Sequence, residues 1–190
     1  MNRLLIMTVG KTHSGKSTFA RELENLLPNS LMIDQDNHAE FVNTHYRKLI
    51  PPAGENVLKH TVTQAVVDYA ADRTDKHVIL CNANRSRKAR VSILDDFRAK
   101  GFTCVLVHFD IPDETLIERV RATTRSKAIF RSAASFEEVL LRQQAQSSNE
   151  DLSAPAAEEA EHLFIVKHAA ETEKVLRRIV DLVSCGRQRA

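Results

Sequence analysis

The chain has 190 residues and a formal net charge of +2; 43% of its residues are hydrophobic and 27% are charged. This length is enough for one domain with a sizeable core, and the composition is that of a globular protein. The near-neutral charge excludes a strong overall attraction to nucleic acid, and no apolar run is long enough to cross a membrane.

Three widely separated cysteines, Cys81, Cys104 and Cys185, occur in the chain. An odd and scattered set is not typical of a disulfide framework or a zinc site, and Cys81 and Cys104 fall in apparent core strands. Residues 1–3 run directly into a strand and lack the pattern of a cleavable signal peptide. We therefore expect a cytoplasmic protein.

The first predicted elements are a buried strand, a glycine loop and a helix. Residues 4–9 (LLIMTV) form an apolar run, as expected of a parallel strand buried on both faces. Residues 10–17 read GKTHSGKS, which matches the G-x-x-x-x-G-K-S pattern of the Walker A phosphate-binding loop. Apolar residues at helical spacing follow in residues 19–27. A chance glycine turn is the alternative, but a helix that begins after such a loop favours nucleotide binding.

Each position of this loop has a physical task. Gly10 and Gly15 permit the tight turn that presents backbone N–H groups to phosphate oxygens. Lys16 would reach the β- and γ-phosphates, and the Ser17 hydroxyl would ligate Mg²⁺. His13 stands where many small kinases have a third glycine. The predicted nucleotide-binding residues of the loop are Gly10, Thr12, His13, Ser14, Gly15, Lys16, Ser17 and Thr18.

The rest of the chain alternates predicted strands and helices. Further strands are expected at 30–33, 77–81, 103–109 and 163–166. Helices are expected at about 37–48 and 55–73, around Ile93, Leu94 and Phe97, from Pro112, at 136–144, and around Val175, Leu176, Ile179 and Val183. In the helix at 55–73, the expected inner face consists of Leu58, Val62, Ala65, Val66 and Tyr69.

This alternation predicts an α/β fold, a three-layer α/β/α P-loop NTPase domain with a five-stranded parallel sheet. We expect a single kinase-like domain over residues 1–190, with a lid at about 123–134. Ligands of such sheets lie at the carboxyl ends of the strands, so the loops that follow the strands are the candidate sites.

Two aspartates, Asp34 and Asp36, follow the second predicted strand, beside the phosphate loop. A phosphotransferase needs a carboxylate there to orient Mg²⁺ and to accept a proton from the attacking hydroxyl. We assign Asp36 as the general base and Asp34 as a ligand of the metal or a contact of a metal-bound water. The alternative for Asp36 is an N-cap of the helix that begins near Asn37.

The loop after the third predicted strand contains Asn82 and a basic cluster. Many P-loop enzymes have an aspartate where Asn82 stands. The cluster could bind an anionic substrate or could form the solvated first turn of a helix capped by Ser86. Its members are Arg85, Arg87, Lys88 and Arg90.

The polar segment 123–134 lacks clear periodicity and is rich in basic residues. Phosphoryl transfer builds charge on the γ-phosphate oxygens, which a mobile arginine can neutralise. A basic, irregular stretch between helices is typical of a closing lid, with an ordinary surface loop as the alternative. We assign Arg125 as the transition-state contact and Arg119 as a phosphate or adenine contact. The basic residues in and beside the segment are Arg119, Arg121, Arg125, Lys127 and Arg131.

Several short motifs, in this order along most of the chain, resemble those of one group of small kinases. They are GKTHSGKST at 10–18, ARE at 20–22, D-x-D at 34–36, N-x-N at 82–84, FDIP at 109–112, and Arg119 followed by RSKA at 125–128. Together they resemble the polynucleotide 5′-hydroxyl kinase and zeta-toxin-like group, within the AAA-type P-loop NTPase superfamily.

The resemblance implies that Lys16 and Ser17 bind the phosphates and Mg²⁺, that Asp36 is the general base, and that Arg125 belongs to the lid. Polynucleotide kinases carry a substrate-binding arginine where this chain has Ala39, and an aspartate where it has Asn82. These differences argue against a nucleic-acid acceptor and leave the ATP-binding half intact.

These expectations combine into an ATP-dependent kinase with Lys16, Asp36 and Arg125 as catalytic residues and with ATP and Mg²⁺ as cofactors. The acceptor would be a hydroxyl of a small molecule or of a nucleic-acid end. The alternative is a nucleotide-gated binding module or slow ATPase without an acceptor, which the amide of Asn82 and the altered loop at His13 favour.

Overall fold

The computed structural model describes residues 3–52, 56–130, 133–146 and 149–187, and only the backbone of 184–187. Its centre is a five-stranded parallel sheet with the strand order β2-β3-β1-β4-β5. The strands are β1 (Arg3–Gly10), β2 (Ser30–Ile33), β3 (His77–Leu80), β4 (Phe102–Phe109) and β5 (His162–Val166). The predicted parallel sheet is confirmed.

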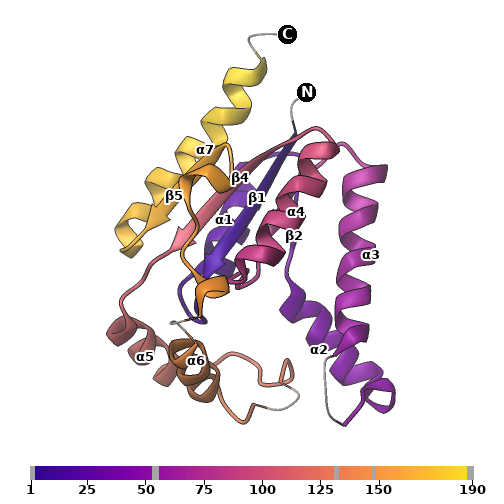
Figure 1. Ribbon diagram of the computed structural model, residues 1–190, viewed down its shortest axis with the longest axis vertical. Coiled ribbons are helices and arrows are strands. Elements are labelled where there is room, and N and C mark those ends of the chain that lie inside the picture. Colours follow the sequence, from indigo (N-terminus) through magenta and orange to yellow (C-terminus); the bar gives the residue numbers. More distant parts are fainter. Residues whose placement is uncertain (1–2, 53–55, 131–132, 147–148, 188–190) are drawn as a thin grey trace.

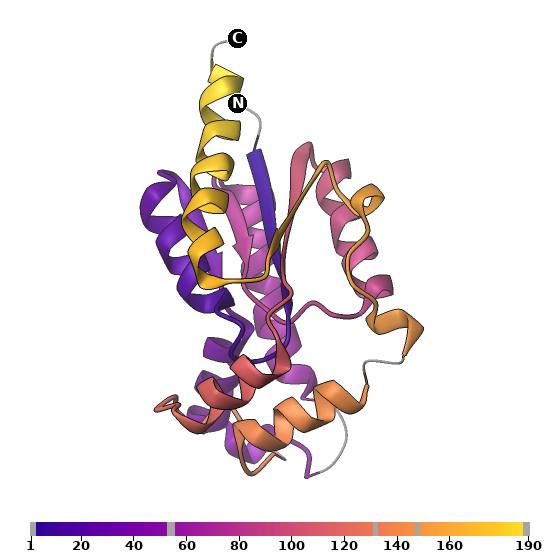
Figure 2. The ribbon, with the colours of Figure 1, turned by 90° about the vertical axis from the view of Figure 1, so that its left-hand side faces the viewer.

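Helices cover both faces of this sheet (Figures 1 and 2). One core cluster joins the sheet to α1 and α7, and a second joins it to α3 and α4. The remaining helices, α2, α5 and α6, lie beyond the carboxyl ends of the strands (Figure 1). The helices are α1 (Lys16–Leu26), α2 (Gln35–His45), α3 (Val57–Arg73), α4 (Arg87–Ala99), α5 (Asp113–Arg121), α6 (Phe136–Ala145) and α7 (Thr172–Arg187). The three-layer α/β/α prediction is also confirmed.

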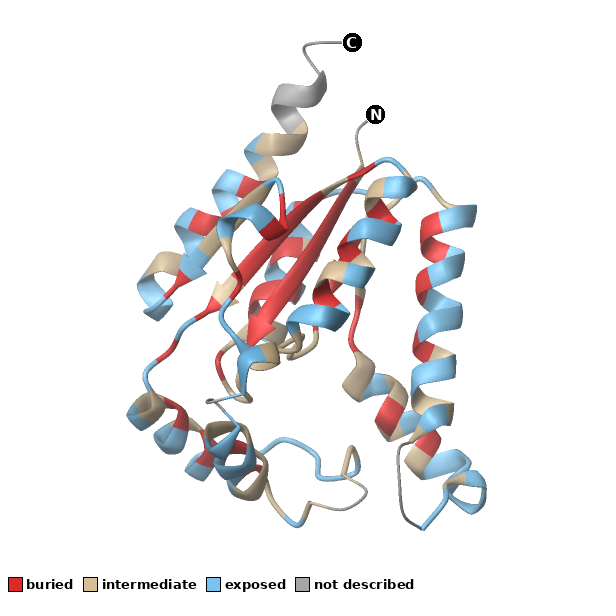
Figure 3. Cartoon of the chain, in the orientation of Figure 1, coloured by how far each residue is buried: buried red, intermediate tan, exposed pale blue. Residues whose placement is uncertain are grey.

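The central strands β1 and β4 are buried on both faces, as their apolar runs predict (Figure 3). Alternate side chains of a strand point to opposite faces. Leu4 and Ile6 accordingly pack with α1 and α7, whereas Leu5 and Met7 pack with α3 and α4. This packing anchors the carboxyl end of β1, from which the phosphate loop departs.

The predicted inner face of α3 is wrong. Tyr69 is 67% exposed and Val66 is 36% exposed, whereas Thr63, Val67, Ala70 and Ala71 are buried. The helix buries its smaller side chains and turns Tyr69 outward. Apolar residues occur all round α3, so its sequence does not specify which face packs on the sheet.

Other predictions about single elements have mixed outcomes. The second helix begins at Gln35 and ends at His45, two residues earlier than expected at the start and three at the end, because Asp34 caps its N-terminus. Cys81 and Cys104 are buried and free, as predicted. The side chain of Cys185 and all of Arg131 lie outside the described residues.

Among the helices that the structure describes, none has the length and hydropathy needed to span a membrane.

Candidate nucleotide-binding and phosphotransfer site

The loop between β1 and α1 depends on two glycines with left-handed backbone geometry. Gly10 has a φ of 152°, and a Cβ there would lie 2.9 Å from the Phe109 carbonyl oxygen. Gly15 has a φ of 102° and is the N-cap of α1. The Gly10 N–H donates to the Ala83 carbonyl over 3.0 Å, which ties the loop to the segment after β3. The loop therefore has the tight turn that a Walker A motif requires.

Lys16 folds back over its own loop. Its Nζ donates to the Lys11 carbonyl over 2.5 Å and lies 3.1 Å from Ser14 Oγ. Burial lowers the pKa of Lys16 to about 8, so the ammonium remains mostly charged at neutral pH. A phosphate group in the loop would give this partly buried cation an anionic partner.

Raising the pH from about 7 to about 9 should therefore weaken Mg·ADP binding about tenfold, because Lys16 loses its proton over this range. Bound phosphate favours the charged ammonium, so affinity must fall as the pH rises through the pKa of the free protein. Calorimetric titration at several pH values measures this effect. Lys16→Ala should bind ADP weakly at both ends of the range; a similar pH-dependent decrease in this variant would show that another group is responsible.

Asp34 and Ser17 place a carboxylate and a hydroxyl close together beside the phosphate loop. Asp34 is 6% exposed, accepts a hydrogen bond from the Asp36 N–H over 2.9 Å, and lies 3.3 Å from Ser17 Oγ. Burial raises the pKa of the Asp34 carboxyl. A hydroxyl and a carboxylate suit Mg²⁺, which usually takes its remaining ligands from phosphates and water. The described ranges contain no cluster of three or more His, Cys, Asp or Glu side chains that could hold a metal.

Asp36 lies in the first turn of α2, and Asp34 rather than Asp36 is the N-cap. Asp36 Oδ2 is 3.2 Å from Arg125 Nη2, so these two residues, predicted from distant parts of the chain, are in contact. Ala39, one turn further along α2, is only 4% exposed and packs in the interior. A substrate-binding arginine of the kind found in polynucleotide kinases has no equivalent at this position.

The segment that contains Arg125 lies along one face of α2. Ser126 Oγ donates to Glu40 over 3.0 Å, and Asn43 Nδ2 donates to the Ala128 carbonyl over 2.7 Å. Asp36, Glu40 and Asn43 are spaced i, i+4 and i+7, so they lie on one side of α2. The described part of 123–134 contains no helix or strand, as predicted. Its action as a lid remains a prediction.

His13 joins the phosphate loop to α6. Its backbone is left-handed, with a φ of 59°, and its ring meets Phe136 edge to face with centroids 4.7 Å apart. Phe130 contacts the same Phe136 ring at 4.6 Å. Burial, helped by the charge of Arg125, lowers the pKa of His13 to about 4, so the imidazole is neutral at pH 7.

Arg119 and Gln143 complete the surroundings of the loop. Arg119 Nη1 donates to the His13 carbonyl over 3.2 Å, and Gln143 Oε1 accepts from the Thr12 N–H over 2.7 Å. Arg119 was predicted beside the nucleotide, whereas Gln143 and Phe136 were missed. Both residues belong to a segment that the sequence predicted to be a helix. No motif indicates that this helix, α6, packs on the phosphate loop.

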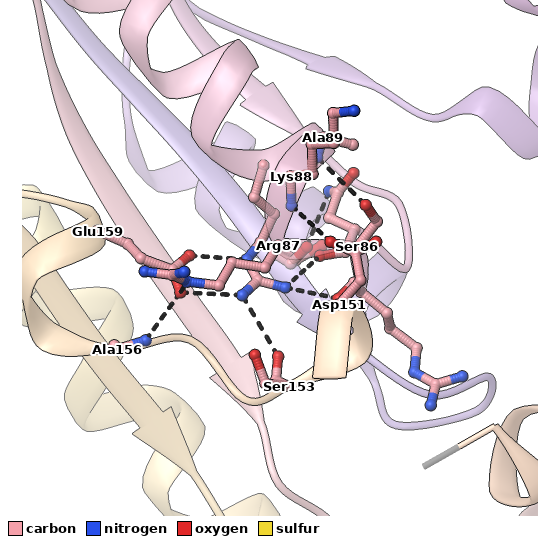
Figure 4. A network of polar contacts seen from close by, with 12 residues as sticks. Ser86, Arg87, Lys88, Ala89, Asp151, Ser153, Ala156 and Glu159 are labelled. Carbon is pink, nitrogen blue, oxygen red and sulfur yellow. Dashed lines mark hydrogen bonds and ion pairs between the residues drawn. The ribbon is translucent and has the colours of Figure 1, made fainter. Parts of the chain in front are cut away.

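The basic cluster after β3 does not form one anion-binding surface. Arg90 is 1% exposed and makes two hydrogen bonds of 3.0 Å to Glu159, in the short helix η3 (Ala157–Glu159). Glu159 also accepts from the Ala156 N–H over 3.1 Å (Figure 4). Arg85 donates to the Gln143 carbonyl over 2.8 Å. Ser86 caps α4, as the structural alternative predicted. The Asn82 side chain accepts from the Gln35 N–H over 3.0 Å and so ties this loop to α2.

A cavity of about 920 Å³ lies among these elements. It is bounded by the phosphate loop, the start of α2, the loop after β3, α5, α6 and the start of α7. Its lining includes Lys16, Ser17, Asp36, Asn82, Arg119, Arg125, Phe130, Phe136 and Glu173. The fold thus brings the predicted phosphate-binding, base and lid residues to one cavity. Asp34 does not line this cavity, but it contacts Ser17, which does.

The sheet order, the Walker A loop and this cavity define a P-loop NTPase domain with a kinase-like fold. A family model described as an AAA domain matches residues 5–149, and the chain belongs to this family. No curated protein sequence matches the chain. The family match does not single out the polynucleotide kinase and zeta-toxin-like group.

Solved structures share the fold at low sequence identity. A candidate kinase from Chloroflexus aurantiacus J-10-fl has a TM-score of 0.65 and 15% identity, covering 94% of this chain and 97% of that one. Kti12 from Chaetomium thermophilum, in complex with ADP-AlF3, has a TM-score of 0.62 and 18% identity, with coverage of 93% and 97%. The APS kinase of Mycobacterium tuberculosis, in complex with AMPPNP and APS, has a TM-score of 0.59 and 14% identity, with coverage of 97% and 99%.

Proposed function

We propose that the protein is an ATP-dependent phosphotransferase that moves the γ-phosphate of Mg·ATP to a hydroxyl group. One observation carries the proposal: a single cavity is lined by the Walker A residues Lys16 and Ser17, by the carboxylate of Asp36 and by the guanidinium of Arg125. Phosphoryl transfer needs a phosphate cradle, a proton acceptor and a cation beside the transferring group. The family assignment and the kinase-like fold agree with this set of parts.

Each residue has a defined part in the proposed reaction. The backbone N–H groups of the loop bind the phosphate oxygens, and Lys16 leaves its carbonyl partner to reach the β- and γ-phosphates. Asp36 accepts the proton of the acceptor hydroxyl, and Arg125, released from Asp36, neutralises charge on the transferring group. Mg²⁺, when bound near Ser17 and Asp34, would offset the charge of the β- and γ-phosphates.

The transfer of label from γ-labelled ATP to an acceptor tests this proposal. The panel includes 5′-hydroxyl oligonucleotides, nucleosides, sugar nucleotides and a metabolite extract. Oligonucleotides belong in it because of the resemblance to polynucleotide kinases. Lys16→Ala should lower transfer about a hundredfold, because it removes a preorganised cation from the transferring phosphate. Undiminished transfer by Lys16→Ala would refute the assignment of the loop.

A nucleotide-gated module without an acceptor is the second candidate. It is favoured by Asn82, which places an amide where many P-loop enzymes have a carboxylate. The Asn82 side chain accepts from the Gln35 N–H. This candidate predicts slow release of phosphate from ATP at a rate that no compound in the panel changes. The kinase proposal predicts a labelled product that appears only with a specific acceptor.

A further inference from the structure

A second cavity, of about 620 Å³, lies where the lid segment meets the end of α2. Asn43 and Thr44 of α2 form one side, and Lys127, Ala128 and Phe130 of the lid segment form another. The rest of the lining follows α2: Arg47, in the short helix η1 (Arg47–Leu49), then Ile50, Pro51 and Pro52. Phe130 also lines the nucleotide cavity, so the two cavities adjoin at this side chain.

Among the described residues, the charged side chains that line this second cavity are both cations. Arg47 and Lys127 both line it, neither forms a salt bridge with a described residue, and no carboxylate is among the lining residues. The dipole of α2 explains a cation near its C-terminus, at Arg47, but not Lys127, which the lid segment brings to the same space. Two cations from separate elements that converge without a counter-ion are suited to bind an anion.

Asn43 supplies a further polar feature at this cavity. Its Nδ2 donates to the Ala128 carbonyl, whereas its Oδ1 is buried and has no hydrogen-bond partner among the described residues. A buried carbonyl oxygen without a donor is costly, so this part of α2 is less stable than a fully hydrogen-bonded helix surface.

The second cavity is also correctly placed to hold one end of an acceptor. Asp36 and Asn43 lie on the same face of α2, seven residues apart, which corresponds to about 10 Å along a helix that rises 1.5 Å per residue. Residues 125–128 occupy this face of α2, so a molecule with its hydroxyl at Asp36 would pass on the Phe130 side, where the two cavities adjoin, to place an anionic group between Arg47 and Lys127.

We propose that Arg47 and Lys127 form the subsite for an anionic group of the acceptor, which is a small molecule bearing a phosphate or carboxylate at the end remote from the hydroxyl that is phosphorylated. This inference rests on the proposed phosphotransfer function for the identity of the ligand as an acceptor. Because Arg47 follows α2 and Lys127 belongs to the segment that packs along α2, the same anion would bridge these two elements.

Amide NMR of the isotopically labelled protein tests the subsite directly. The protein is saturated with Mg·ADP to fill the Walker A loop and is then titrated with inorganic phosphate or, separately, with malonate. We expect saturable shifts at residues 43–52 and 127–130. Arg47→Gln and Lys127→Gln should each weaken binding of the effective anion about tenfold, the loss of one charge-assisted contact.

Lys48→Gln is the matched control, because Lys48 is an exposed neighbour of Arg47 that does not line the cavity. It should leave the affinity unchanged. Absence of shifts with both anions, or equal weakening in Lys48→Gln, would overturn the subsite. A response to phosphate alone assigns a phosphate-bearing acceptor, and a response to malonate alone assigns a carboxylate. Failure of the label-transfer screen would instead refute phosphotransfer and leave a measured anion site standing.

Discussion

Replacing Asp36 with asparagine should lower phosphotransfer about a thousandfold, the scale of a lost general base, while the Kd of Mg·ADP changes little. The amide keeps the shape of the carboxylate and can still accept from Arg125, but it cannot take the proton of an acceptor hydroxyl. The rate of label transfer and a calorimetric Kd, measured on the same preparation, separate the two effects.

Glu40→Gln is the matched control for this variant. Glu40 lies one turn along the same face of α2 and accepts a hydrogen bond from Ser126, so its substitution also removes a carboxylate from the contact between α2 and residues 125–128. It should retain nearly all activity. Equal losses in the two variants would mean that the contact between α2 and residues 125–128, rather than proton transfer, explains the effect. A collapse of ADP affinity in Asp36→Asn would instead make Asp36 part of the nucleotide or metal site.

Replacing Arg90 with methionine should lower the free energy of unfolding by about 3–5 kcal/mol, because it leaves the buried charge of Glu159 without its partner. The two side chains are 0% and 1% exposed, and the guanidinium also donates to the carbonyls of Asn84, Arg85 and Ser153. The ion pair thus joins α4 to the segment before β5, and the other bonds of the guanidinium add the loop after β3. Urea denaturation followed by circular dichroism measures the loss.

Two further variants isolate the cause of this destabilisation. Arg87 lies 3.6 Å from the same Glu159, but its side chain is 53% exposed, so Arg87→Met should change stability little. Adding Glu159→Leu to Arg90→Met removes the uncompensated charge and should restore part of the lost stability. If Arg90→Met is no less stable than Arg87→Met, the buried pair does not have this role.

The sheet and the phosphate loop were predictable because their signals are local. A strand buried on both faces needs a continuous apolar run, such as residues 4–9, whatever the rest of the chain does. The loop needs glycine at Gly10 and Gly15 because only glycine readily adopts their backbone geometry. These signals can be recognised within a few consecutive residues.

Contacts between distant segments had no such signal. Arg90 looked like one member of a basic cluster, because its partner Glu159 is 69 positions away. The inner face of α3 was misassigned, because apolar residues occur all round that helix and only the sheet selects among them. Phe136 and Gln143 approach the phosphate loop only through the packing of α6.

The two aspartates after β2 illustrate what the sequence predicts and what only the tertiary structure decides. Their position after a parallel strand was sufficient to place both carboxylates at the edge of the sheet beside the phosphate loop. Only the folded chain turns Asp34 inward, as the cap of α2 beside Ser17, and directs Asp36 toward Arg125. The sequence by itself determined the sheet and the loop, because the signals for both lie in neighbouring residues. The tertiary structure decided which side chains meet, because such contacts depend on how separate elements pack.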